Sequence, residues 1–222
     1  MAQIAEDLLL LLLDNAANRP ALDRDRREKV LGAAVLLDLA LACRIRPSVD
    51  GEPVPPGHLL LLAGPDPRDP ILYPAVQLLQ RRPLKPRVAV AKLRGRIEPA
   101  VLAHLERSGH IRPIQLQGTR SNGSRAWPIA DRSRVNEARS ALLAALFDLH
   151  SPSPTTAAII TLLHAVDGLG AILSLNERGW EWVNSRAADI AGGCWVDESV
   201  GPLGLAEVNL AVTASAVRAA LT

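Results

Sequence analysis

Side chains that could bind an anion are concentrated in the middle of the sequence. Residues 81–139 carry 14 basic and four acidic side chains, whereas the segments before and after them are net acidic. Only three of the 25 basic residues are lysines, and arginine suits phosphate because its planar guanidinium donates two parallel hydrogen bonds. The pattern predicts an anionic partner, unless acidic neighbours in the folded chain cancel the charge. The candidate anion-binding residues are Arg26, Arg27, Arg81, Arg82, Lys85, Arg87, Arg94 and Arg96.

Residues of the types that perform catalysis show no catalytic spacing. The sequence has no Walker-type phosphate loop, no GxSxG and no HExxH, and its five histidines have no metal-ligand spacing. Asp167 follows His164 by three residues in an apolar stretch, where a buried, hydrogen-bonded structural pair is the commoner role. We therefore expect no enzymatic activity, no cofactor and no metal site.

Residues 98–129 have the outline of a winged helix, with a predicted helix, Gly109 and then a basic hairpin. In such a domain the helix that carries His104 and Arg107 would enter a DNA major groove. Against this, the helix is rich in Ala and Leu, offers few groups that read bases, and is flanked by long apolar helices. Nucleic-acid binding by this segment is thus the second hypothesis. Trp127 could reach lipid headgroups, but a role in anchoring the hairpin to the core is favoured.

The composition favours a mainly α, single globular domain over residues 1–222, because Leu and Ala dominate the apolar share and aromatic residues make up 3%. Two stretches, about 30–43 and 156–168, are apolar on nearly all faces and are predicted to pack at the centre of a helical bundle. Residues 110–129 are predicted to form one protruding β-hairpin, with the turn at Asn122-Gly123. Pro113 places this hairpin outside any larger sheet.

Several local features complete the prediction. Asp23 or Asp25 should cap the second helix, and Asp69-Pro70 should open a helix that runs to Gln80. Cys43 and Cys194 have no metal or disulfide spacing, which favours small core residues in a reducing compartment. No apolar run reaches the roughly 20 residues of a membrane span, and no signal peptide is visible, so we expect a cytoplasmic protein.

The order of several segments resembles the Golgi phosphoprotein 3 family, in its bacterial branch. The resemblance covers nearly the whole chain and rests on 4–14 (IAEDLLLLLLD), 36–45 (LLDLALACRI), 68–79 (RDPILYPAVQLL), 102–111 (LAHLERSGHI), 156–169 (TAAIITLLHAVDGL) and 207–221 (EVNLAVTASAVRAAL). It implies one mostly helical domain with a four-helix core and a protruding hairpin. It also implies binding of phosphatidylinositol 4-phosphate and adaptor work that retains glycosyltransferases.

The lipid pocket of the family is not matched residue by residue. The family's tryptophan and arginine on the second helix fall at Asp23 and Gly32, and its pair of arginines falls near Gly95 and Glu98. We therefore expect a peripheral protein on the inner face of the membrane that binds anionic lipid headgroups, phosphoinositides among them, mainly by charge. A protein partner and homo-oligomerisation through the hairpin are further expectations, and nucleic acid is disfavoured.

Overall fold

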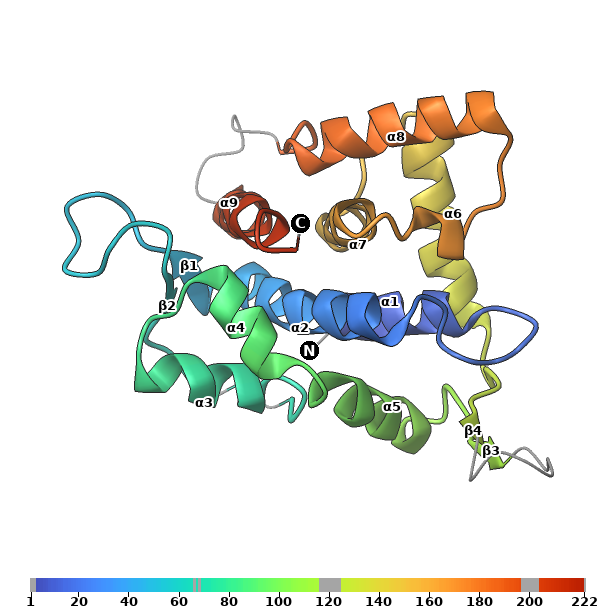
Figure 1. Cartoon of the computed structure of the whole chain (residues 1–222), viewed down its shortest axis with the longest axis horizontal. Helices are drawn as coiled ribbons and strands as arrows, with labels where there is room; N and C mark the ends of the chain where they lie inside the picture. Colours follow the sequence, from blue (N-terminus) through green and yellow to red (C-terminus); the bar gives the residue numbers. More distant parts are fainter. Residues whose placement is uncertain (1–2, 66, 68, 116–124, 197–203, 222) are drawn as a thin grey trace.

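The protein is mainly α-helical, as the composition predicts (Figure 1). The computed structural model describes residues 3–65, 67, 69–115, 125–196 and 204–221. The helices in this part of the chain are α1 (Gln3–Leu13), α2 (Arg24–Leu41), α3 (Tyr73–Arg81), α4 (Pro86–Leu93), α5 (Ile97–Arg107), α6 (Ser133–Phe147), α7 (Pro154–Ala165), the short 3-10 helix η1 (Leu169–Ala171), α8 (Glu177–Ala191) and α9 (Leu205–Arg218). The strands are β1 (Ile45–Pro47), β2 (Leu59–Leu61), β3 (Ile114–Gln115) and β4 (Arg125–Ala126).

The helices stack in layers around α1 and α2. Helices α7 and α9 pack on one side of this pair, and α4 and α5 pack on the other, with α3 beyond α4 (Figure 1). Helix α8 covers α7 as an outer layer, and α6 runs along the side of the stack. The mutual contacts of α1, α2, α7 and α9 form the four-helix core that the family resemblance implies.

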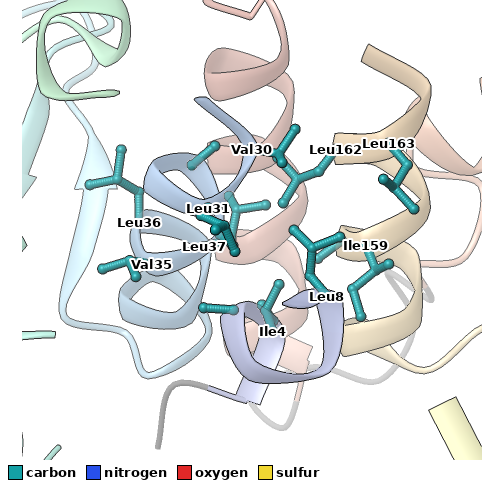
Figure 2. Packing of buried hydrophobic residues seen from close by; sticks show 14 of the residues in the cluster. Ile4, Leu8, Val30, Leu31, Val35, Leu36, Leu37, Ile159, Leu162 and Leu163 are labelled. Atoms are coloured by element: carbon teal, nitrogen blue, oxygen red, sulfur yellow. The ribbon is translucent and has the colours of Figure 1, made fainter. Parts of the chain in front are cut away.

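Helices α2 and α7 lie at the centre of the fold, as predicted for the stretches 30–43 and 156–168. Leu37 and Leu39 of α2, and Leu162 and Leu163 of α7, are all fully buried, and Figure 2 shows α2 and α7 side chains meeting in one cluster. Exposing these apolar side chains to water would cost about 25 cal/mol per Å² of surface. Helix α1 is buried on every face as well, because residues 4–13 lie between α2, α5, α6 and α7. None of the described helices combines the length and the apolar character needed to cross a bilayer.

Helix ends follow the capping signals in the sequence. Asp23 is the N-cap of α2, where its carboxylate accepts a hydrogen bond from the Arg26 N–H at 3.0 Å. Gly109 follows α5 with a φ of +78°, a left-handed conformation that glycine adopts without strain. The prediction for Asp69-Pro70 was wrong, because Asp69 instead closes a turn by accepting from the Ile71 N–H. The helix begins later, at Tyr73, and ends at Arg81.

Two small antiparallel pairs make up the β-structure of the described residues. Strands β1 and β2 pair across the loop 48–58, a region that the sequence only partly indicated. Strands β3 and β4 pair through Ile114 and Ala126, belong to no larger sheet, and project from the body beside α5 (Figure 1). The predicted hairpin is therefore confirmed, while its turn at Asn122-Gly123 lies outside the described residues. Trp127 anchors the base of the hairpin. The backbone N–H of Trp127 donates to the Asn18 carbonyl at 2.7 Å, and the Trp127 ring packs against the core.

Two predictions about buried residues were wrong. Cys43 and Cys194 are both exposed, because each lies in a turn just after a helix and not on the core face of one. Asp167 is exposed and His164 is half-buried, so they do not form the predicted buried, hydrogen-bonded pair. Asp167 has left-handed backbone (φ +52°) in the turn that ends α7, which points its side chain away from the packed interior.

Candidate functional site: an exposed basic face

Part of the central positive charge is cancelled inside the fold. Four arginines of the basic segment form ion pairs with acidic side chains of the first 28 residues, which are themselves part of a net acidic segment. The pairs are Arg94 with Asp25 and Glu28, Arg132 and Arg139 with Asp14, and Arg134 with Glu6 and Asp7. The basic segment therefore has one part that holds helices together and another part that is available to a partner.

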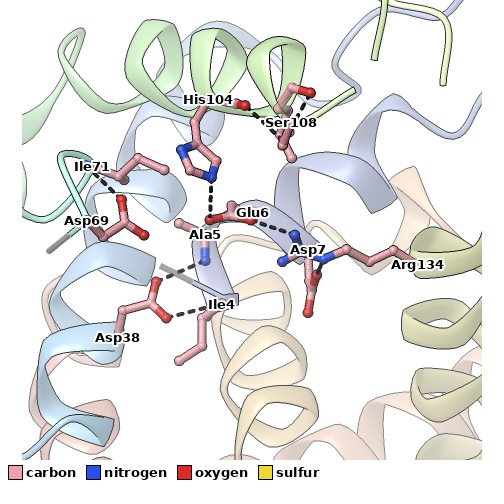
Figure 3. A network of polar contacts seen from close by, with 11 residues as sticks. Ile4, Ala5, Glu6, Asp7, Asp38, Asp69, Ile71, His104, Ser108 and Arg134 are labelled. Atoms are coloured by element: carbon pink, nitrogen blue, oxygen red, sulfur yellow. Dashed lines mark hydrogen bonds and ion pairs between the residues drawn. The ribbon is translucent and has the colours of Figure 1, made fainter. Parts of the chain in front are cut away.

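The buried pairs around α1 are structural (Figure 3). Arg134 of α6 donates to Glu6 at 2.5 Å and to Asp7 at 2.6 Å, and both carboxylates are more than nine-tenths buried. His104 of α5 approaches the other oxygen of Glu6 at 3.6 Å. Burial raises the pKa of Asp7, although Arg134 acts to lower it. These contacts tie α5 and α6 to α1.

A second buried carboxylate serves the start of α1. Asp38 of α2 accepts hydrogen bonds from the backbone N–H groups of Ile4 and Ala5 at 2.8 and 3.1 Å (Figure 3). These N–H groups lie in the first turn of a helix and have no partner within it. Burial raises the pKa of Asp38 well above its ordinary range, against the effect of the two hydrogen bonds. The carboxylate is therefore used as a helix cap and is not open to a ligand.

Six of the basic residues that remain available lie between the end of α3 and the start of α5. We call them the basic face, and all of them are exposed without an ion pair among the described residues: Arg81, Arg82, Lys85, Arg87, Lys92 and Arg96. Three more arginines of the segment, Arg107, Arg112 and Arg125, are exposed in the same way but lie further along the chain. Five of the six residues of the basic face were predicted from sequence. Lys92 was missed, although the buried positions of α4 recur at intervals of three and four residues, which leaves Lys92 outside the buried side of the helix.

The local structure fixes this face outward. In α4, Pro86, Ala89, Val90 and Leu93 are buried, so Arg87 and Lys92 point away from the core. The α3–α4 connection is held by Leu84, which is 5% exposed and exchanges backbone hydrogen bonds with Leu59 of β2. Arg82 and Lys85 flank this anchored residue. The charges therefore sit on backbone that the fold holds in place.

The other three predicted residues are engaged within the fold. Arg26 donates to Asp23 at 2.5 Å and to the carbonyls of Val166 and Asp167, which links α2 to the end of α7. The Arg27 side chain is only 15% exposed and lies 3.0 Å from Glu98. Arg94 pairs with Asp25, as described above. These three arginines are therefore not available to a ligand and do not belong to the basic face.

A cleft of about 510 Å³ lies where the resemblance implies a lipid pocket, between the start of α2, α5 and the base of the hairpin. Pro99, Leu102 and Trp127 supply apolar walls. Its charged lining is balanced, with three arginines and three glutamates: Arg24, Arg27, Arg125, Glu28, Glu98 and Glu106. Arg24 pairs with Glu28 at 2.7 Å, so much of the arginine charge is already neutralised. The cleft lacks the excess of positive charge that a phosphomonoester requires.

The four unmatched pocket positions have structural roles here. Asp23 caps α2, and a side chain at Gly32 would meet Leu93 and the Val90 backbone of α4 within 3.5 Å. Gly95 and Glu98 do line the cleft, but Gly95 has no side chain and Glu98 is acidic. The residues present therefore do not fit the phosphoinositide site of the family as the resemblance describes it.

The geometry of α5 disfavours the winged-helix hypothesis. His104, which would have to reach a DNA groove, is directed at the buried Glu6 (Figure 3). Ile97, Val101 and Leu105 are buried against α1 and α2, and the open side of the helix carries the acidic Glu106 beside the basic Arg107. These two charges offset each other, so this side of α5 lacks the net positive charge that attracts a phosphate backbone. Within the described residues, no group of His, Cys, Asp and Glu side chains could hold a metal ion.

The comparison with known families agrees with the fold. The family model described as Golgi phosphoprotein 3 matches residues 4–203, which is most of the chain. No curated protein matches the chain. The match spans α1, α2 and α7 of the core, the basic face, the cleft and the hairpin, and it ends before α9. The chain therefore belongs to the Golgi phosphoprotein 3 family.

Proposed function

We propose that this protein is a non-catalytic, peripheral membrane protein that docks on anionic headgroups through the basic face. The observation that supports this most is that six basic side chains within 16 residues lie exposed without an ion pair to any described residue, while other arginines of the same segment are neutralised. Each basic group near an anionic bilayer contributes about 1 kcal/mol. The exposed Val88, next to Arg87 on α4, adds apolar contact there.

We propose further that charge matters more than the identity of the lipid. The cleft between α2, α5 and the hairpin has balanced charge, and its inner arginines are already paired, so it offers little selectivity for phosphatidylinositol 4-phosphate. The inner, cytoplasmic face of a membrane carries anionic lipid and is the location that fits. Docking there would suit an adaptor that holds a protein partner at the membrane, which the family resemblance implies.

Vesicle co-sedimentation tests the proposal. Neutral phosphatidylcholine vesicles are compared with vesicles that also contain phosphatidylglycerol, and with vesicles that contain phosphatidylinositol 4-phosphate at matched total charge. Three or four basic groups acting together predict a preference for the anionic vesicles of roughly 10²- to 10³-fold. Added salt should weaken this preference, because it screens exposed charges. Equal binding to both anionic vesicles at matched charge would support binding by charge.

The alternatives give different results. A large preference for phosphatidylinositol 4-phosphate at matched charge would show that the cleft is selective after all. Absence of binding to any anionic vesicle at low salt, together with a shift of duplex DNA, would favour the nucleic-acid hypothesis. If neither ligand binds, the basic face does not dock on a polyanion and the function resides in a protein partner.

A further inference from the structure

Helix α9 presents an apolar stripe to solvent on the side opposite the core. Leu205, Val208 and Val212 are 64%, 39% and 53% exposed, which is unusual for aliphatic side chains on one helix. The exposed small residues Ser215 and Ala219 continue the stripe. The buried residues of the helix, Leu210, Thr213, Ala214 and Val217, lie on its other side and pack toward α2 and α7. Within the part of the chain that the structure describes, the stripe is therefore not used to pack the fold.

The spacing of the stripe is that of a helix that packs against another helix. Its members follow one another at intervals of three, four, three and four residues, the alternation of a and d positions in a heptad seam. A solvent-facing helix surface is normally polar along such a line. The regular spacing thus points to a helix as the missing partner.

We propose that the partner is α9 of a second copy, and that the two helices pair antiparallel about a twofold axis near Val212. In this register, Leu205 of one chain lies over Ala219 of the other, and Val208 lies over Ser215. Each large side chain therefore meets a small one, and Val212 meets its own counterpart on the axis. A twofold interface requires this kind of self-complementarity.

Charge favours the antiparallel direction. Glu207 and Arg218 lie on the same flank of the stripe, three turns apart, and neither has an ion pair among the described residues. Antiparallel pairing brings Glu207 of each chain to Arg218 of the other, which gives two ion pairs. Parallel pairing would put the corresponding flanks of the two helices on opposite sides of the seam, so that neither ion pair could form. Flanking charges set partner choice and direction in helix pairs in this way.

The length of the seam sets the strength of the association. With 14 residues, α9 is about 21 Å long, so the contact is smaller than a standard protein interface. We therefore expect a reversible dimer that forms as the concentration rises. This dimer differs from one formed through the hairpin, because α9 and the β3–β4 pair lie at opposite sides of the molecule (Figure 1).

Sedimentation equilibrium of the full chain, from low micromolar to several hundred micromolar, tests the association. The wild type should show a monomer–dimer equilibrium. Val212→Glu places two carboxylates together on the axis and should leave a monomer. Val88→Glu, the same change at an exposed position of α4, should dimerise like the wild type. A wild type that stays monomeric throughout, or a dimer that Val212→Glu does not affect, would overturn the proposal.

Charge exchange tests the direction of pairing. Glu207→Arg and Arg218→Glu should each weaken the dimer by roughly ten-fold, since each turns two attractions into repulsions. The double variant should restore wild-type affinity, which neither change would do if it acted only by damaging the helix. Circular dichroism confirms that each variant is folded. Failure of the double variant to recover, with its fold intact, would rule out the antiparallel register.

Cysteine cross-linking gives an independent readout. In a background where Cys43 and Cys194 are replaced by serine, Val212→Cys should form an intermolecular disulfide, because the two residues meet on the axis. Leu205→Cys should not pair with itself, since antiparallel packing separates the two copies by about 21 Å. The reverse pattern would indicate parallel pairing and would contradict the proposal.

Discussion

Removing Arg134 should expose how the fold depends on its buried acidic residues. Its guanidinium is shared by Glu6 and Asp7, at 2.5 and 2.6 Å, and both carboxylates are more than nine-tenths buried. Arg134→Ala would leave two buried negative charges, and among the described residues His104 would be the basic side chain that remains close, at 3.6 Å from Glu6. Breaking a buried pair in this way costs about 3–5 kcal/mol.

The magnitude can be measured by thermal and denaturant unfolding. For a chain of this size, each kcal/mol lowers the melting temperature by about 2–4 °C, so Arg134→Ala should melt roughly 6–20 °C below the wild type near neutral pH. Arg132→Ala is the matched control. Arg132 also pairs with an acidic residue near the N-terminus, but its side chain is 58% exposed, and such a pair contributes about 0–1 kcal/mol.

The pH dependence separates charge from packing. Burial raises the pKa of Asp7 in the native state, so its contribution to stability is complete below the unfolded pKa and is lost as the pH rises through the native value. Without Arg134 this loss should be larger. The penalty for Arg134→Ala should therefore shrink toward about pH 4 and grow toward neutral pH. A penalty equal to that of Arg132→Ala, or one that does not change with pH, would refute this reasoning.

Three further predictions follow from single contacts. Gly32→Arg should not create a lipid pocket but should destabilise the protein by about 1–3 kcal/mol in denaturant unfolding, because the new side chain must displace α4. Asp38→Ala should lower the free energy of unfolding by about 2 kcal/mol, since it strips the N-terminal cap from α1. The Arg46 guanidinium lowers the pKa of Glu52 to about 2. The stabilisation from this pair is therefore present above pH 4.5 and is lost as the pH falls toward 2. Arg46→Gln should raise the titration midpoint of Glu52, which NMR can measure.

The helical core was predictable because its signals are local. Leu37 and Leu163 lie in stretches that are apolar on every face, which only a central position satisfies. Asp23 as the N-cap of α2 was also predictable, because capping depends on a short pattern. The start of α3 was misplaced because a turn at Asp69 uses the same residue types as a helix N-terminus.

The candidate site was only partly predictable because ion pairing is a long-range property. Sequence counts Arg94 and Arg87 alike, but folding places Arg94 beside Asp25, 69 residues away, and leaves Arg87 exposed. The apolar stripe of α9 was not recognised for a similar reason. Leu205 and Val212 look like core residues until the core side of the helix is known.

Binding to anionic vesicles by two variants of equal charge tests the central claim most directly. Arg87→Glu changes the basic face, whereas Arg178→Glu makes the same change at an exposed position of α8, across the molecule (Figure 1). Exposed charges contribute little to stability, so both variants should fold normally. The proposal predicts that Arg87→Glu weakens binding to phosphatidylglycerol vesicles by roughly ten-fold or more, while Arg178→Glu binds nearly like the wild type. Equal weakening by both variants would show that net charge, and not the basic face, drives binding and would contradict the proposed docking surface.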